Sequence, residues 1–488
     1  MTNFYKILGL AIFGLFLFIN IYTINDGHNW GDDFAQYIHH AVNLVEHKSY
    51  TSDISLDYWI VYPPGFPLLL SSLIFWFGLN FKILKLLNVL VWALSALVVY
   101  DLALKRLNLL WARILTVWFL SLPYFFFFKQ NVLSDLPFMS FVLLSIWSLM
   151  KLEEAEEKGL KDSSRFFLFL SIVFISYALL IRWAGGSLFL AVAVYFLVIR
   201  GEFNKLWGFV LGAIISLSVA LKCGSLVSGY FYKTTVSLYD WFLAIWYNIS
   251  YNFEMFLSFF IPDDKLFSKL IMLLNAYFIN VIFAVFLFAI IGVFLYRLCQ
   301  KRVSFMGCFV FFYLMGVMLW PVRGGSRYVL PIMIPVTIIM IQFCRPVLQK
   351  FVMVVFLVLI CQNIYIIGSN LKFKDDDIFQ KDSLEMLQWV VINIKPDERY
   401  MFAKPRAVSL LTHRVGASFW VHAEDKDVWY KRIKPLHINY LIADKQYDQF
   451  SQYNDLNWRV NKDELICNRI WENSRYKIFK VSDLLGKD

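Results

Sequence analysis

The chain has 488 residues, of which 59% are hydrophobic and only 17% are charged. A soluble domain usually carries about a quarter charged residues, so this composition excludes an ordinary soluble protein and predicts an integral membrane protein of many helices. The formal net charge is +10, but the basic residues are scattered in short loops. Membrane topology explains that distribution and nucleic-acid binding does not, so we expect membrane lipids as partners.

Helices that cross a bilayer need about 20 apolar residues, and this length predicts about eleven membrane-spanning segments. Loops rich in Lys and Arg alternate with less basic ones and are therefore predicted to be cytoplasmic, as is the N-terminus. The loop 25–82, the loop 223–274 and everything after residue 370 are then outside. The predicted segments are 4–24, 83–104, 109–128, 136–151, 166–181, 186–200, 205–222, 275–298, 303–320, 328–344 and 351–369.

The first outer loop, residues 25–82, contains two predicted helices at the membrane surface. From Phe34 to Val45 the apolar residues recur at helical spacing, and the other face carries polar residues that include Gln36 and His40. That pattern is typical of an amphipathic helix lying on a membrane. A second apolar piece, Phe66 to Leu79, is too short to span comfortably and is expected to lie at the interface or to re-enter.

Residues 371–488 are predicted to form a small soluble α/β domain that follows the membrane domain 1–370. Asp382-Ser383-Leu384-Glu385 resembles a capping box that opens a helix ending near Ile394. Strands are predicted at 400–403 and 438–442, with a hairpin around 469–479. The predicted fold class is therefore an all-α polytopic membrane protein with a small C-terminal α/β domain.

Two adjacent carboxylates, Asp32 and Asp33, precede the amphipathic helix. Asp33 fits a helix N-cap with Gln36 three residues later, and Asp32 would favour the helix dipole. The functional alternative is a general base. A carboxylate that lies near a low-dielectric boundary and beside a second carboxylate can have a raised pKa, which suits it to taking a proton from an acceptor hydroxyl. Capping and catalysis are compatible, because a cap fixes the position of the side chain.

Asp135 lies at the outer end of two aromatic-rich spans, directly before Leu136-Pro137. It fits an N-cap of the following helix with Pro just inside. It is also expected at the same membrane depth as Asp32 and Asp33, so the three could line one polar cavity or hold a divalent cation through carboxylate oxygens.

Arg182, Arg323 and Arg327 are cations at the outer ends of predicted spans. Such arginines either extend into the headgroups or clamp a phosphate with their planar set of donors. We favour the phosphate for Arg327, which is isolated in a long apolar region beside Gly324-Gly325. The histidines of the first loop, His40 among them, have no zinc-like spacing. No phosphate-binding Gly-rich loop or nucleotide fingerprint occurs, so no soluble nucleotide cofactor is indicated.

Four elements follow one another on the predicted outer side of residues 1–345. They are Asp32-Asp33, Tyr62-Pro63-Pro64-Gly65-Phe66-Pro67, Ser134-Asp135-Leu136-Pro137 and Arg327-Tyr328-Val329-Leu330-Pro331. In their order and spacing the chain resembles the GT-C fold glycosyltransferases. It resembles the bacterial relatives of the protein O-mannosyltransferases and of the lipid A aminoarabinose transferase, a glycosyltransferase family 39-like group.

The resemblance implies an inverting hexosyl- or pentosyltransferase in a bacterial inner membrane, with its C-terminal domain in the periplasm or outside the cell. It implies a polyprenyl-phosphate sugar as donor and an envelope lipid, glycan or protein as acceptor. An acidic loop residue acts as the base, and cationic residues hold the departing lipid phosphate. The residues expected to bind substrate are Asp135, Arg182, Arg327, Arg323, Tyr37 and His40.

Two departures from the family pattern bear on these roles. The family often has Asp-Glu, a small residue and then Tyr, which aligns Asp33 and Tyr37 and puts Phe34 in the Glu position. Aligning Asp32 instead restores the second acid but shifts Tyr37 by one, so we favour Asp33 as the base. The aminoarabinose transferases carry Lys where this chain has Tyr62, so we expect Arg182 or Arg327 to contact the phosphate.

Two other functions are compatible with a membrane protein of this kind. A transporter or flippase of a lipid-linked intermediate would need charged or Gly/Pro-broken segments near the bilayer midplane. Here the polar residues gather at the outer ends of the spans, which disfavours transport. A catalytically inactive assembly factor is the remaining alternative, and donor binding without turnover would indicate it.

Overall fold

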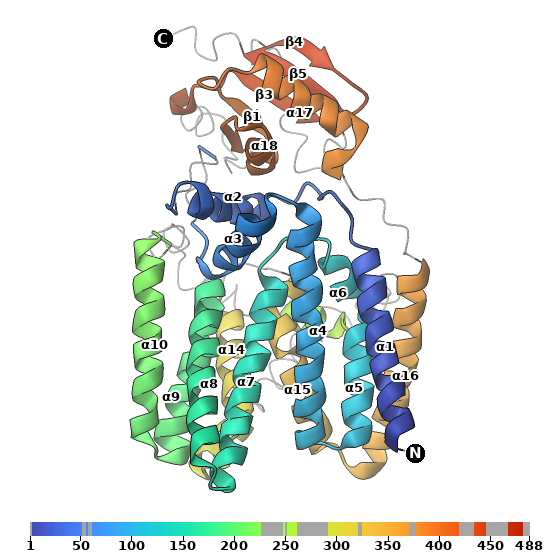
Figure 1. Ribbon diagram of the computed structural model, residues 1–488, viewed down its shortest axis with the longest axis vertical. Coiled ribbons are helices and arrows are strands. Elements are labelled where there is room, and N and C mark those ends of the chain that lie inside the picture. The colour runs from blue at the N-terminus through green and yellow to red at the C-terminus, as the bar shows by residue number, and fades with distance from the viewer. Residues whose placement is uncertain are drawn as a thin grey trace.

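The computed structural model describes residues 2–50, 55–56, 61–225, 247–248, 251–260, 291–320, 325–369, 377–418, 434–445 and 467–481. A bundle of long helices forms one end of the molecule, and a smaller unit built around a sheet forms the other (Figure 1). Helices α2 (Asp33–Glu46) and α3 (Gly65–Phe77) lie between the two. The N-terminus is at the end of the bundle that faces away from the sheet.

The bundle contains the helices that the apolar runs predict. Every predicted span within the described ranges overlaps a helix, whereas most of 275–298 lies outside them. Among the described residues, six helical segments (α4, α7, α8, Trp183–Arg200, α10 and α16) are long and apolar enough to cross a membrane, so the total of about eleven stays a prediction. The bundle helices are α1 (Thr2–Tyr22), α4 (Phe81–Arg106), α5 (Leu109–Ser121), α6 (Pro123–Phe128), α7 (Asp135–Glu157), α8 (Lys161–Ile181), α9 (Gly186–Val194) with η2 (Tyr195–Arg200), α10 (Phe203–Lys222), α14 (Phe305–Leu319), α15 (Leu330–Phe343) and α16 (Pro346–Ser369).

The amphipathic helix predicted from Phe34 is present as α2; His47 on its polar face is exposed, but most of that face does not meet water. Gln36, His40 and Asn43 on that face are buried. Helix α18 (Pro405–Thr412) of the C-terminal unit packs on α2 and binds Gln36 through Arg406, while the ring of Tyr50 stacks on His40. The periodicity therefore identified the two faces correctly, and protein covers part of the polar one.

Helix α3 meets the end of α8 at backbone distance. A Cβ atom on Gly65 would lie 2.6 Å from the backbone carbon of Leu180 and 2.7 Å from the backbone nitrogen of Ile181. The hydroxyl of Tyr177 donates to the carbonyl oxygen of Gly65 over 2.9 Å. Glycine is therefore needed here for close approach of two chains.

We expect Gly65→Ala to lower the stability of the protein by about 1–3 kcal/mol, because the new methyl group must displace backbone atoms. The matched control is Gly186→Ala, since a Cβ at Gly186 meets no atom within 4 Å. Thermal unfolding in detergent measures both. Equal melting temperatures for the two variants would show that the contact with α8 is not tight.

In its described residues the C-terminal unit is a five-stranded mixed sheet with helices α17 and α18, in the strand order β2-β1-β3-β5-β4. Both predicted strands and the predicted hairpin are present, whereas α18 and β2 were not predicted. Helix α17 has the predicted extent, but Gln380 is its N-cap, so the capping-box prediction is wrong. The predicted boundary at residue 370 falls in 370–376, outside the described residues, and stays a prediction. The elements are α17 (Lys381–Asn393), β1 (Tyr400–Phe402), α18, β2 (Gly416–Ser418), β3 (Tyr440–Asp444), β4 (Cys467–Glu472) and β5 (Tyr476–Val481).

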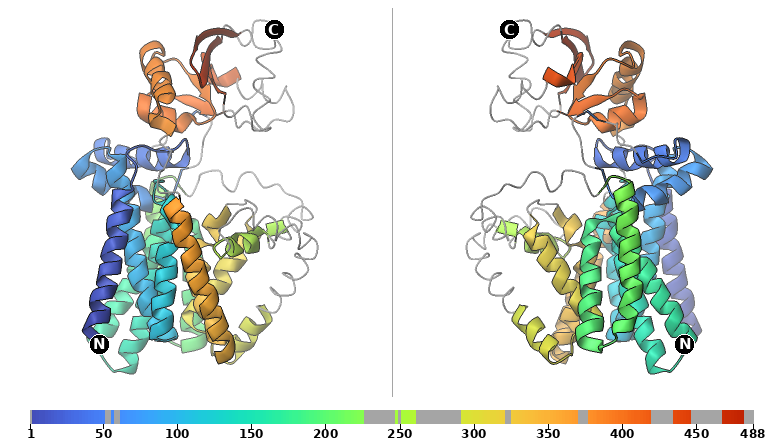
Figure 2. Two further views of the ribbon diagram at one scale, coloured as in Figure 1. Left: turned by 90° about the vertical axis from the view of Figure 1, so that its right-hand side faces the viewer. Right: turned by 90° about the vertical axis from the view of Figure 1, so that its left-hand side faces the viewer.

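The first outer loop attaches the C-terminal unit to the bundle (Figure 2). The buried ring of Trp30 packs edge-on against Phe402 and Tyr476, with centroids 5.5 and 6.3 Å away. The backbone nitrogen of Leu56 donates to the carbonyl oxygen of Gly416 on β2 over 3.0 Å. The unit is therefore held over α2 by apolar and backbone contacts together.

Candidate functional site

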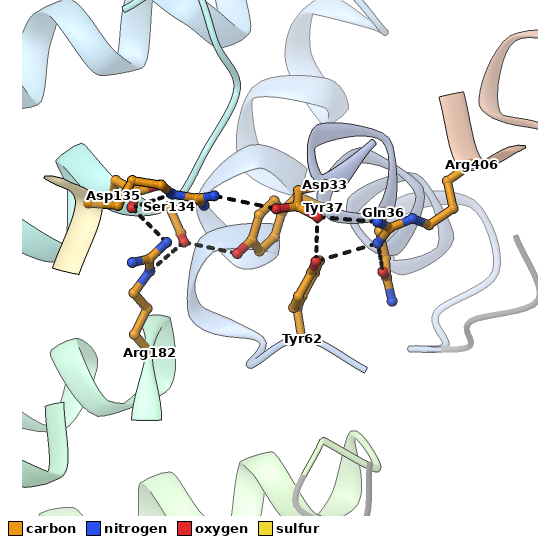
Figure 3. A network of polar contacts seen from close by, with 9 residues as sticks. Asp33, Gln36, Tyr37, Tyr62, Ser134, Asp135, Arg182 and Arg406 are labelled. Atoms are coloured by element: carbon orange, nitrogen blue, oxygen red, sulfur yellow. Dashed lines mark hydrogen bonds and ion pairs between the residues drawn. The ribbon is translucent and has the colours of Figure 1, made fainter. Parts of the chain in front are cut away.

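Charged side chains from distant parts of the chain form one network where α2, α7, α8 and α18 meet (Figure 3). It contains three carboxylates and three guanidinium groups, so its formal charge is balanced. Charges removed from water are tolerated when they are paired in this way. The six residues are Asp32, Asp33, Asp135, Arg182, Arg327 and Arg406.

Asp135 is the centre of one half of the network, and its side chain is fully buried. Arg327, in the short helix η3 (Gly325–Tyr328), donates from Nε and Nη2 to the two carboxylate oxygens over 3.0 and 3.1 Å. Arg182 lies 2.7 Å from Oδ1 of Asp135 and donates from Nε to Oγ of Ser134 over 3.0 Å. The Ser134 and Tyr37 hydroxyls are 2.9 Å apart. Asp135 is the first residue of α7 and Ser134 its N-cap, so the prediction that Asp135 is the cap is wrong.

Asp33 is the centre of the other half. Its Oδ1 accepts hydrogen bonds from the hydroxyl of Tyr62 over 2.8 Å and from Nη2 of Arg406 over 3.2 Å. Its Oδ2 lies 3.6 Å from Nη1 of Arg327. The side chain is 37% exposed, against 14% for Asp32 and none for Asp135. Asp33 is therefore the most exposed carboxylate of this network.

The prediction that Asp33 is the N-cap of α2 is wrong, because the helix begins at Asp33 and its N-cap is Asp32. The expectation of a raised pKa is also wrong. Burial alone would raise the pKa of Asp33, but the charges of Arg406 and Arg327 and the Tyr62 hydrogen bond outweigh it and lower the pKa. Asp33 is therefore ionised at neutral pH.

Arg406 is the site residue that the sequence analysis missed. It follows Pro405 in the first turn of α18, and its side chain is 5% exposed. Its Nε lies 2.6 Å from Oδ2 of Asp32, and its Nη1 donates to Oε1 of Gln36. No local pattern points to these contacts, because the partner Asp33 lies 373 positions earlier in the chain.

The remaining predicted site residues have varied surroundings. Arg323 lies outside the described residues. His40 is fully buried, with its ring stacked 4.2 Å from that of Tyr50. Within the described ranges no three His, Cys, Asp or Glu side chains converge, and guanidinium groups occupy the carboxylates of the network. The divalent cation stays a prediction from the sequence.

Comparison with known proteins shows the fold of the chain. The sequence matches no protein-family model and no curated protein. Crystal structures of ArnT from Cupriavidus metallidurans match over 100% of both chains at 12% identity, with TM-scores of 0.59 for the apo state and 0.53 for the complex with undecaprenyl phosphate. The Archaeoglobus fulgidus oligosaccharyltransferase in complex with Zn and sulfate matches 92% of this chain and 69% of its own at 13% identity, with a TM-score of 0.55. The chain therefore has the GT-C fold of these membrane glycosyltransferases.

Proposed function

We propose that the chain is an inverting glycosyltransferase that moves a sugar from a polyprenyl-phosphate donor to an acceptor at the membrane surface. One observation carries the proposal: the accessible carboxylate of Asp33 lies beside the Arg327 guanidinium, which Asp135 holds together with Arg182. A base and an anion-binding pair are thus adjacent. The likeness in fold to an ArnT that binds undecaprenyl phosphate supports this assignment.

Arg327 and Arg182 are assigned to the phosphate of the donor. Arg327 is 30% exposed and has Nε and Nη2 engaged by Asp135, so its Nη1 is the nitrogen turned toward Asp33. A guanidinium fixed in this way offers donors to a phosphate without first having to be ordered. Asp135 is too deeply buried to contact substrate, so its role is to position the two arginines.

Asp33 is assigned as the general base. The acceptor oxygen attacks the anomeric carbon from the face opposite the phosphate, and the bond between that carbon and the phosphate oxygen breaks. The electron pair leaves with the polyprenyl phosphate, and the acceptor proton passes to Oδ2 of Asp33 and then to water. Because the pKa of Asp33 is lowered, its carboxylate is ionised and can accept the proton that the acceptor oxygen loses.

The site is assigned to the outer face of a bacterial inner membrane, with a cytoplasmic N-terminus. Basic residues at the other end of the bundle support this orientation, because cytoplasmic loops carry an excess of Lys and Arg. Lys105 pairs with Glu154 there, and Lys205 pairs with Glu156. The acceptor is an envelope lipid, glycan or protein, and the sugar is a hexose or a pentose.

Turnover by the purified protein tests the proposal. We expect it to release undecaprenyl phosphate from at least one of a panel of undecaprenyl-phosphate sugars when a bacterial envelope extract supplies acceptors. Nucleotide sugars are the control donors and should not react. Binding of undecaprenyl phosphate without turnover of any lipid-linked sugar would show an inactive assembly factor instead, and transfer from a nucleotide sugar would contradict the proposed donor class.

A further inference from the structure

We infer that Arg406 is a positioning residue for Asp33, so that the base is correctly held only when the C-terminal unit is docked on α2. The inference rests on the proposed function, because it concerns how the proposed base is presented to the acceptor.

The contacts of Asp33 distinguish its two carboxylate oxygens. Oδ1 is fixed by two donors, the Tyr62 hydroxyl at 2.8 Å and the Arg406 Nη2 at 3.2 Å. Oδ2 lies 3.6 Å from Nη1 of Arg327, beyond hydrogen-bond distance. Donors on one oxygen only prevent rotation of the carboxylate and direct Oδ2 toward the anion-binding side. Loss of Arg406 would leave Oδ1 with the Tyr62 hydroxyl and Oδ2 with the more distant Arg327 guanidinium.

Arg406 acts through Asp33 and not on the substrate. Its side chain is 5% exposed, and its nitrogens are directed to Asp32, Asp33 and Gln36 at the start of α2 and to the Tyr62 hydroxyl. A planar guanidinium can reach several acceptors at fixed angles, whereas a lysine ammonium cannot reproduce that arrangement.

The docking of α18 and the position of Asp33 are linked through the neighbouring carboxylate. Oδ2 of Asp32 binds Nε of Arg406, and its Oδ1 accepts from the backbone nitrogen of Ala407 over 3.2 Å. Asp32 thus binds an otherwise unsatisfied nitrogen in the first turn of α18. Movement of the C-terminal unit away from α2 would break these contacts together.

The charges around Asp33 give a test that separates positioning from folding. The groups that face it are Arg406 from α18, Arg327 from η3, Tyr62 from the loop before α3, and Asp32 and Tyr37 from the region of α2. Removal of Arg406 takes away one of the two cations beside Asp33 and also leaves the Asp32 carboxylate without its ion-pair partner. The pKa of Asp33 should then rise, and the acid limb of the activity profile should move to higher pH.

The experiment compares Arg406→Gln with Arg414→Gln in the full-length protein. Arg414 is a matched control because it donates to the carbonyl oxygens of Ile394 and Val391 within the C-terminal unit. With a donor that the wild type uses, Arg406→Gln should lower kcat about 10- to 100-fold at neutral pH through misplacement of the base. Its acid limb should move upward, while the KM for donor stays within a few-fold. Arg406→Lys keeps the positive charge, so it should retain most of the wild-type pH profile, but its kcat should stay below that of the wild type. Arg414→Gln should keep the wild-type profile.

A second measurement does not depend on turnover. Carbodiimide labels protonated carboxyl groups, so mass spectrometry of Asp33 labelling against pH reads its protonation directly. We expect labelling of Asp33 to begin at higher pH in Arg406→Gln than in the wild type. If no lipid-linked sugar reacts, the proposed function fails while this shift remains. An unshifted labelling curve, or an equal shift in Arg414→Gln, overturns the inference about Arg406.

Discussion

Asp33→Asn should transfer sugar about 10²- to 10⁴-fold more slowly than the wild type, the range that a general base contributes. The asparagine side chain has the shape of aspartate and keeps an oxygen for the Tyr62 hydroxyl, but it cannot take up a proton. It also removes a negative charge 3.6 Å from Nη1 of Arg327. The KM for the anionic donor should therefore stay the same or fall. Steady-state kinetics and undecaprenyl phosphate binding measure the two effects separately.

Asp32→Asn is the control for that experiment. Its carboxylate is bound to Arg406 and to the first turn of α18, so its loss should affect docking of the C-terminal unit more than proton transfer. A large loss in Asp32→Asn with wild-type turnover in Asp33→Asn would assign the base to Asp32. Full activity in both variants would exclude a carboxylate base at this position.

Asp135→Asn should destabilise the protein by about 3–5 kcal/mol, because removing one partner of a buried ion pair leaves uncompensated charge. Here one carboxylate serves two guanidinium groups, those of Arg182 and Arg327. Both would be left without their main counter-charge and would repel each other. Thermal unfolding in detergent measures the loss, and the KM for donor should rise as the two arginines lose their fixed orientation.

An exposed ion pair provides the matched substitution. Asp162 and Arg165 pair over 3.8 Å with both side chains largely exposed. Asp162→Asn should therefore leave the stability nearly unchanged, because water screens this pair. If the two Asp→Asn variants melt at the same temperature, the buried carboxylate is not the centre on which the arginine pair depends.

The membrane helices were predictable from sequence because a long apolar run has few alternatives in a bilayer. Helix α2 was predictable for the same kind of reason, since its apolar residues recur at helical spacing. What covers its polar face was not predictable. Periodicity shows that Gln36 and His40 share a face, but water and another protein surface suit that face equally well.

Parts of the site were predictable one residue at a time. Asp33, Asp135 and Arg327 are charges beside apolar runs, where charge is unusual, so each could be identified alone. The helix-capping roles predicted for Asp33 and Asp135 were wrong, because arginines distant in the sequence bind these two carboxylates. Arg406 gave no signal, since a charged residue in a soluble domain is ordinary and its partners are remote in sequence.

The separation between the two parts of the site also has a consequence for biosynthesis. Asp33 and Arg406 are 373 positions apart, and translation at about 5–20 residues per second makes that interval roughly 20–75 s long. Contacts that close such long loops form late. The growing chain thus carries an incompletely oriented carboxylate until the C-terminal unit has been synthesised and has docked on α2. We expect unfinished or truncated chains to leave the pool of lipid-linked sugar unused.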